Sequence, residues 1–336
     1  MGADARRRDA LSPRRRDLDE DDVRVRPTRQ GSRPRTRTRP AHEQAADGFV
    51  VAVDRGRYTC RVGVNTVTAM RARELGRKSV VVGDRVSLVG DTSGATDALA
   101  RIVRIADRTS VLRRTADDTD PYERVIVANA DQLVIVTALA NPPPRTGLID
   151  RCLVAAYVGG LDPLLCLTKS DLADPAELTS LYSDLGLRTV NVRRDLPYDT
   201  LRDQLQGQLS VLVGHSGVGK STLVNALVPD ADRAIGRVSD VGKGRHTSSS
   251  AVMLALDDDS WIVDTPGIRS FGLAHVQPSD VLAAFPDLAE GALGCPANCE
   301  HLSAADGCAL DDWVATGHAT PGRLASFRRL LTARSA

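Results

Sequence analysis

The sequence of 336 residues has few aromatic residues, few cysteines and no long hydrophobic run. Only 11 residues are aromatic, so a core must consist mainly of Val, Leu, Ile and Ala. Six cysteines are too few for a disulfide-stabilised scaffold. No run of about 18 or more apolar residues occurs, and no apolar stretch follows the polar N-terminus. We therefore expect a soluble, cytoplasmic protein with neither a transmembrane helix nor a secretory signal.

Lysine is also scarce, because 40 of the 44 basic residues are Arg and only Lys78, Lys169, Lys220 and Lys243 are Lys. The formal net charge of +1 conceals two parts of opposite sign. Residues 1–45 carry 13 Arg against 8 acidic residues, whereas the remainder carries 31 basic and 35 acidic residues. Any binding of nucleic acid by the folded part must therefore depend on local groups of Arg and not on total charge.

The first third of the chain divides into a tail and a β-rich region. Residues 1–45 contain too few apolar residues to offset their conformational entropy, which predicts a disordered, Arg-rich tail. The tail is either a solubilising linker or a basic arm for RNA phosphates. Residues 46–115 contain four or five short β-type runs, such as GFVVAV at 48–53, which predict a small closed barrel of the OB-fold type. Such a barrel either binds nucleic acid or serves packing alone.

Residues 120–275 alternate apolar runs with segments of helical spacing, which predicts a mostly parallel sheet with helices on both faces. Strands are expected at 131–139, 163–169, 187–192 and 210–214. Helices are expected at 148–158, 175–185 and 198–207, and a fourth helix follows the glycine-rich turn after 210–214 and ends at Leu227. A hairpin is expected at 253–264. Residues 276–336 are expected to form a small α-helical domain around a group of Cys and His residues.

A glycine-rich segment, GHSGVGKS at 214–221, follows a predicted strand and opens a helix. It fits G-x-x-x-x-G-K-[ST], and this context identifies a phosphate-binding P-loop. In such a loop backbone N–H groups surround the phosphates, Lys220 reaches the β- and γ-phosphates, and the Ser221 hydroxyl binds Mg²⁺. The residues predicted to bind the nucleotide here are Gly214, His215, Ser216, Gly217, Val218, Gly219, Lys220, Ser221 and Thr222.

Two further motifs indicate which nucleotide is bound. Asp264-Thr265-Pro266-Gly267 ends the predicted hairpin, where Asp264 would hold Mg²⁺ and the Gly267 N–H could meet the γ-phosphate. Thr168-Lys169-Ser170-Asp171 ends a strand and resembles the [NT]-K-x-D guanine motif. The Asp171 carboxylate can accept hydrogen bonds from guanine N1–H and its exocyclic amine, a donor pair that adenine lacks. The Lys169 stem would cover the ring, so the motifs together predict GTP.

The order of these motifs is unusual. Ordinary GTPases place the P-loop first, whereas here 168–171 comes before the P-loop, which is followed by Thr247 and then by 264–267. This order predicts a circularly permuted GTPase. The sequence resembles the ribosome small subunit-dependent GTPases of the bacterial RsgA/YjeQ family. The similar stretches are RTSVLRR (108–114), ANADQLVIV (128–136), LIDRCL (148–153), TKSDL (168–172), GHSGVGKSTLVNAL (214–227), GKGRHTS (242–248), DTPGIRSFGL (264–273) and CPANCEHLSAADGC (295–308).

The resemblance covers about residues 48–331 and implies an OB domain, a permuted GTPase domain and a zinc domain. It implies binding to the small (30S) ribosomal subunit and its rRNA late in maturation, with subunit-stimulated GTP hydrolysis that drives release. Thr247 would contact Mg²⁺ and the γ-phosphate. His246 is the candidate to orient the attacking water, because Ile268 stands where a Gln usually follows D-x-x-G. His246, Thr247 and Lys220 are thus the expected catalytic residues.

Two details depart from the family pattern. The loop near 191–194 lacks the usual S-A-type motif, which leaves the residue that meets the guanine oxygen unassigned. The Cys/His spacing also differs slightly, with three and six residues in the outer gaps where the family commonly has four and five.

Cys295, Cys299, His301 and Cys308 supply three thiols and one imidazole within 14 residues. These are tetrahedral zinc ligands, and because the protein fills all four positions we predict one structural Zn²⁺. The other cysteines lie in apolar runs and are expected to be buried: Cys60, Cys152 and Cys166.

Two other functions remain open on the sequence alone. A generic P-loop ATPase or nucleotide kinase is disfavoured by Thr168–Asp171. A non-catalytic RNA-binding module would use the nucleotide only structurally. We expect a monomer that binds GTP and GDP.

Overall fold

A computed structural model describes residues 42–54, 56–75, 79–115, 123–229, 231, 251–265, 272–304 and 307–334. The chain divides into two units, Met1–Ala41 and His42–Ala336, and every described residue belongs to the second. The prediction of a disordered tail therefore lies largely outside the described residues. Within the described ranges, no helix is both long enough and apolar enough to cross a membrane.

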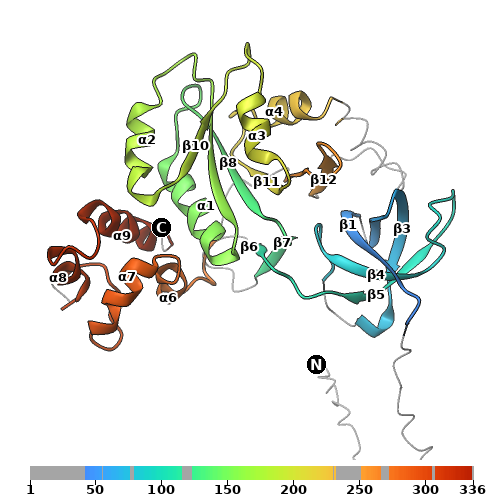
Figure 1. Cartoon of the computed structure of the whole chain (residues 1–336), viewed down its shortest axis with the longest axis horizontal. Helices are drawn as coiled ribbons and strands as arrows, with labels where there is room; N and C mark the ends of the chain where they lie inside the picture. Colours follow the sequence, from blue (N-terminus) through green and yellow to red (C-terminus); the bar gives the residue numbers. More distant parts are fainter. Residues whose placement is uncertain are drawn as a thin grey trace, which may run out of the picture. The chain divides into compact units, whose positions relative to one another are not determined.

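Five strands form a closed barrel (Figure 1). They are β1 (Ala46–Asp54), β2 (Arg57–Val62), β3 (Asn65–Arg71), β4 (Arg85–Gly90) and β5 (Ala100–Ile105). β1 pairs with both β2 and β4, and β3 pairs in parallel with β5, which closes the barrel. Each strand contributes an aliphatic or Cys side chain with no exposed surface: Val50, Cys60, Val67, Leu88 and Ile102. The predicted OB-type barrel is confirmed.

The apolar run at 78–90 predicts β-type segments on either side of a turn at Gly83-Asp84. Of residues 78–90 only β4 is a strand, because the chain turns sharply before it. Gly83 has φ +88°, and a Cβ atom there would lie 1.9 Å from Ala128 O. The buried Asp84 carboxylate accepts a hydrogen bond from Val81 N at 2.8 Å and pairs with Arg108 Nε at 2.7 Å. These contacts fix the turn that the sequence predicts at Gly83-Asp84.

The central sheet contains six strands in the order β10-β9-β8-β11-β13-β12. They are β8 (Gln132–Ala138), β9 (Asp162–Thr168), β10 (Arg188–Asn191), β11 (Leu209–Val213), β12 (Val252–Ala255) and β13 (Trp261–Asp264). All neighbours are parallel except β12 and β13, which form the predicted hairpin. The sheet continues into the barrel, because Ala52 of β1 pairs with Val252 of β12.

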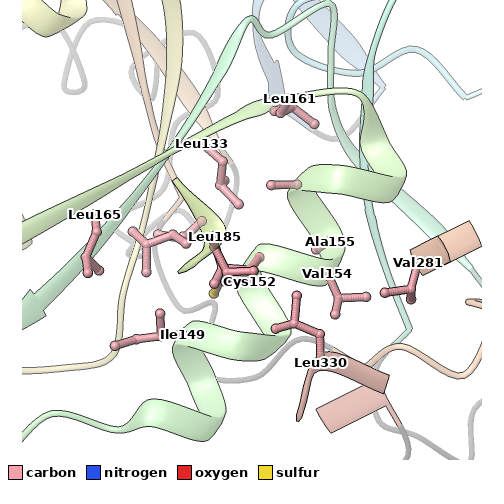
Figure 2. Close-up of a cluster of buried hydrophobic side chains, with 14 of the residues drawn as sticks. Leu133, Ile149, Cys152, Val154, Ala155, Leu161, Leu165, Leu185, Val281 and Leu330 are labelled. Atoms are coloured by element: carbon pink, nitrogen blue, oxygen red, sulfur yellow. The ribbon is translucent and has the colours of Figure 1, made fainter. Parts of the chain in front are cut away.

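Helices cover both faces of this sheet, as predicted. The helices in the described part of this region are α1 (Thr146–Gly159), α2 (Ala176–Tyr182), α3 (Asp199–Leu205) and α4 (Lys220–Leu227), and short 3-10 turns occur at Arg73–Leu75, Ser183–Leu185 and Ala292–Gly294. Every residue of β8 is buried, since helices pack on both of its sides. In Figure 2, Ile149 and Cys152 of α1 lie toward Leu133 and Leu165 of the sheet. α1 therefore packs with one side against the sheet, and its other side is available to the C-terminal helices.

The C-terminal region packs on the outer side of α1. It contains α6 (Pro278–Leu282), α7 (Pro286–Gly291), α8 (Leu310–Ala315) and α9 (Pro321–Arg334). Val154 of α1 lies beside Val281 of α6 and Leu330 of α9 (Figure 2). One apolar face of α9 is buried, and its members include Leu324, Phe327 and Leu331. The expected small α-helical region is thus present.

Side chains also link α9 to the central helices. Asp150 of α1 pairs with Arg329 at 3.2 Å, and the Arg329 guanidinium lies 4.9 Å from the centre of the Tyr182 ring. Arg151 Nη1 donates a hydrogen bond to Ala333 O at 3.0 Å. Burial raises the pKa of Asp150, an effect that Arg329 opposes. The contact between α1 and α9 therefore contains a buried charge pair.

A two-stranded hairpin lies between the barrel and the central sheet in sequence. It consists of β6 (Val111–Arg114) and β7 (Arg124–Ala128), which the sequence analysis did not predict. Val82 of the barrel bridges to Val127, and Thr115 bridges to Gly272. The hairpin region is thus bonded both to the turn before β4, at Val82, and to the chain that leads into the C-terminal helices, at Gly272.

Candidate nucleotide site and Cys/His cluster

The P-loop residues connect β11 to α4. Gly217 and Gly219 adopt φ values of +85° and +98°, a left-handed backbone that side chains with a Cβ atom rarely adopt. A Cβ atom on Gly214 would lie 2.4 Å from Val136 O of the neighbouring strand. α4 begins at Lys220, so its first N–H groups have no acceptor within the helix. The glycines therefore produce the tight strand-to-helix turn that a phosphate-binding loop requires.

The P-loop lies next to the end of β13. β11 and β13 are parallel neighbours, and Leu212 stands opposite Asp264 in the register. Lys220 Nζ lies 2.6 Å from Asp264 Oδ1 and donates a second hydrogen bond to Thr265 O at 3.2 Å. Ser221 is exposed at the start of α4. The structure thus brings together the lysine, hydroxyl and carboxylate that the sequence assigned to phosphate and Mg²⁺.

The guanine motif follows β9 and contacts the P-loop directly. Thr168 Oγ1 donates a hydrogen bond to Val218 O at 2.5 Å. Lys169, with φ +57°, donates from Nζ to Gly217 O at 3.0 Å. The Asp171 side chain is exposed. Two motifs almost fifty residues apart in sequence are therefore adjacent, as one nucleotide site requires.

Sequence reasoning missed one member of this site. The backbone carbonyl of Asn141, a residue with φ +49°, accepts a hydrogen bond from Lys169 Nζ. Pro142 Cδ lies 3.6 Å from the Cβ position of Gly217. The run of three prolines after Asn141 marks a stiff loop at the end of a predicted strand, and this signal could have identified the position.

Three predicted residues lie outside the described residues: His246, Thr247 and Gly267. The remaining P-loop members are in place. His215 is buried, and its Nδ1 lies 2.9 Å from Ser216 O. Val218 is fully buried and Thr222 is exposed, so the apolar residue faces the core while the hydroxyl faces outward.

The four predicted zinc ligands lie together. The ligand atoms of Cys295, Cys299, His301 and Cys308 are all within 4.8 Å of one another. Cys295 Sγ lies 3.9 Å from Cys308 Sγ and 3.5 Å from His301 Nδ1. Zinc–sulfur bonds of about 2.3 Å in a tetrahedron place two sulfur atoms about 3.8 Å apart. The cluster could therefore hold a tetrahedral metal ion, and its residues fit zinc.

The pKa values of two groups in the cluster are shifted. Burial raises the pKa of the Cys308 thiol to about 11, so a positive ion is needed to stabilise its thiolate. Burial, together with Arg328, lowers the pKa of His301, which favours the neutral imidazole that binds metals. Arg328 donates from Nε to His301 O at 3.0 Å and pairs with Asp311 at 2.6 Å. This pair positions the loop that carries the imidazole.

The other cysteines are buried, as predicted. Cys60, Cys152 and Cys166 are at most 1% exposed. Burial raises the pKa of Cys60 and Cys166 to about 12, and it raises that of Cys152 as well. These thiols therefore stay protonated and serve packing.

Comparison with known proteins agrees with this geometry. Residues 105–274 match the family described as RsgA GTPase. A protein named small ribosomal subunit biogenesis GTPase RsgA, from Gemmatimonas aurantiaca, is 36% identical over 262 residues, covering 76% of this chain and 84% of that protein. A protein of the same name from Pseudomonas aeruginosa is 38% identical over 263 residues, covering 75% of each chain.

Solved structures show the same fold. The crystal structure of YjeQ from Thermotoga maritima matches with a TM-score of 0.64 and 24% identity, covering 86% of this chain and 98% of that one. YloQ, described as a circularly permuted GTPase, matches with a TM-score of 0.61 and 22% identity, covering 88% and 96%. The predicted permutation is thereby confirmed. On the matched family region and these relatives, the chain belongs to the RsgA GTPase family.

Proposed function

We propose that this protein is a GTPase that binds the small ribosomal subunit and its rRNA late in maturation, and that subunit-stimulated hydrolysis drives its release. The observation that carries the proposal is the pairing of a guanine motif with a P-loop in permuted order. Thr168 and Lys169 bond directly to P-loop carbonyls, so base and phosphates would occupy one continuous site. The names of the relatives, which refer to small ribosomal subunit biogenesis, support the partner.

In this proposal each motif has one task. Asp171 selects guanine, the P-loop N–H groups and Lys220 hold the phosphates, and Thr247 and His246 act on the γ-phosphate and the attacking water. Residues 214–222 and 168–171, together with Gly267, are the proposed GTP-binding residues. Lys220 is paired with Asp264 at 2.6 Å, a contact that phosphate and metal ion would replace.

The proposal includes two metal ions. Ser221, Thr247 and Asp264 would hold Mg²⁺, which prefers such oxygen ligands. When bound, Mg²⁺ neutralises charge that develops on the phosphate oxygens. Cys295, Cys299, His301 and Cys308 would hold one structural Zn²⁺, since four protein ligands leave no position for a substrate.

The proposed organisation has four parts: an Arg-rich tail at 1–45, an OB-fold domain at 46–115, a permuted GTPase domain at 120–275 and a zinc-binding domain at 276–336. We infer that the protein acts as a monomer in the cytoplasm, where its proposed partner is assembled. The barrel is the proposed contact with rRNA, because exposed Arg side chains such as Arg57, Arg101 and Arg104 lie on its strands.

A GTPase assay with and without purified small ribosomal subunits tests the proposal. We expect slow turnover alone and many-fold stimulation by the subunits. No turnover under either condition would indicate an RNA-binding module that uses the nucleotide structurally. Faster turnover of ATP than of GTP would indicate a generic ATPase.

The variant Asp171→Asn tests the base specificity in the same assay. An Asn amide can donate to xanthine O2 but offers guanine a mismatched group, so GTP affinity should fall about 100-fold while XTP is accepted. Asp174→Asn is the matched control, because Asp174 is a nearby acid whose Oδ1 accepts a hydrogen bond from Ala176 N at 2.9 Å. Equal effects of the two substitutions would contradict the role of Asp171.

A further inference from the structure

The loop at 192–196 follows β10 and lies beside the guanine motif. Val192 donates its backbone N–H to Leu167 O at 2.8 Å and accepts a hydrogen bond from Ser170 Oγ at 3.3 Å. β10 pairs in parallel with β9 on the side away from β8 and β11. The loop is therefore held next to Asp171, on the side of the motif opposite the P-loop.

The side-chain hydroxyls of the guanine motif are already used as donors within the protein. The Thr168 hydroxyl donates to Val218 O at 2.5 Å, and the Ser170 hydroxyl donates to Val192 O. A hydroxyl has one hydrogen to donate. Guanine, however, presents the acceptors O6 and N7 beside the N1–H that Asp171 would bind. The adjacent loop can supply a side-chain donor for these acceptors.

Arg193 in this loop offers suitable donors. Its Nε and Nη2 donate to Asp195 Oδ1 and Oδ2 at 3.1 and 2.8 Å. This fork fixes the guanidinium plane and uses two of its five N–H groups, which leaves the Nη1–Nη2 edge for a ligand. The Arg193 and Asp195 side chains are 42% and 61% exposed, so their ion pair contributes little to stability.

Arg193 is also electrostatically coupled to the guanine motif. Hydrogen bonding and the charge of Asp195 raise the pKa of Arg193, and the Asp171 carboxylate raises it further. In the chain, Arg193 directly follows Val192, whose carbonyl accepts the hydrogen bond from Ser170, the neighbour of Asp171. Arg194, the next residue, makes no hydrogen bond or ion pair with any residue in the described part of the chain.

We propose that the Arg193 guanidinium donates hydrogen bonds to O6 and N7 of the bound guanine, so that Asp171 and Arg193 read adjacent edges of one base. Bidentate contact of Arg with O6 and N7 is a frequent mode of guanine recognition. Asp195 acts as a positioning residue that holds the guanidinium plane. The assignment rests on the proposed GTP-binding function and adds a second specificity-determining side chain to that site.

The test measures the affinity of the full chain for GDP, 7-deaza-GDP and ADP by isothermal titration calorimetry. The 7-deaza analogue replaces the N7 acceptor with a C–H group. We expect wild-type protein to bind GDP about tenfold more tightly than 7-deaza-GDP. Arg193→Ala should bind GDP about tenfold more weakly and should lose the difference between the two nucleotides. The matched control Arg194→Ala should keep both wild-type values.

Three results would overturn the assignment of Arg193. They are equal binding of GDP and 7-deaza-GDP by wild-type protein, a retained difference in Arg193→Ala, and loss of the difference in Arg194→Ala instead. The first comparison changes only the ligand, so it can overturn the assignment even if a variant fails to fold. Equal binding of GDP and ADP by wild-type protein would instead contradict the proposed function itself.

Discussion

The barrel and the C-terminal helices are joined to the central sheet in different ways. The barrel is attached through backbone hydrogen bonds, in the β1–β12 pairing at Ala52 and Val252 and in the bridge from Val82 to Val127, together with packed side chains. The C-terminal helices are attached through side chains, with the Asp150–Arg329 pair at their centre. Backbone hydrogen bonds depend little on residue identity, whereas a buried ion pair depends on both of its partners. Point substitutions should therefore affect the second junction more than the first.

The largest effect should follow loss of the Cys/His cluster. α6, α7 and α8 have only five or six residues each, and helices this short do not persist without tertiary or metal support. Cys308→Ser, or removal of metal by a chelator, should destabilise this region by on the order of 5 kcal/mol or more. Amide hydrogen exchange should rise in α8 and stay unchanged in β2 of the barrel. Unchanged exchange in α8 would contradict this prediction.

An intermediate effect is expected for the ion pair between α1 and α9. Asp150→Ala leaves the mostly buried Arg329 guanidinium without its carboxylate and should lower the free energy of unfolding by about 3 kcal/mol. The double variant Asp150→Ala/Arg329→Ala should recover part of this loss in urea denaturation, since no unpaired charge remains. A double variant less stable than the single one would contradict that explanation.

The same carboxyl group gives a pH dependence. Burial raises the pKa of Asp150 above its ordinary value of 3.8. Just above pH 3.8, this carboxyl group is therefore protonated in a larger fraction of native molecules than of unfolded molecules. The contribution of this group to stability therefore falls as pH rises through the window that begins at 3.8. The part of the pH slope that comes from this group should be absent in Asp150→Ala.

The smallest effect is expected at the barrel junction. Phe49 of β1 meets Trp261 of β13 edge to face, with ring centres 5.2 Å apart. Phe49→Leu keeps the β1 backbone and most of the apolar volume, so it should cost about 1 kcal/mol in the same denaturation experiment. A cost equal to that of Asp150→Ala would remove the contrast between the two junctions.

The sequence predicted the elements whose signals are local. The P-loop, the Thr168–Asp171 turn and the 253–264 hairpin each lie within a short segment, where spacing and residue type determine the backbone. The Cys/His cluster was predictable for the same reason, because its four ligands span 14 residues. The adjacency of the P-loop, the Thr168–Asp171 turn and Asp264 follows from parallel strands whose carboxyl ends meet at one edge of the sheet.

Other features depend on contacts between distant segments and had no local signal. Asp150 and Arg329 are 179 residues apart, and neither position differs in pattern from an ordinary helical charge. Asn141 acts through its carbonyl, which every residue type possesses. β6 and β7 have only four and five residues, and a segment of nine residues separates them. The alternation of apolar and polar residues in each is therefore too brief to indicate a hairpin. The assembled structure is needed to identify such features.

The pairing of β1 with β12 has a consequence for solubility. β12 would otherwise be the outermost strand of the central sheet, with one row of backbone N–H and C=O groups open to other chains. An unpaired edge of apolar residues such as Val252–Ala255 is a template for aggregation. The barrel covers part of this edge, because β1 pairs with β12 at Ala52 and Val252. A fragment that lacks the barrel would therefore expose a strand that promotes association between copies of the GTPase domain.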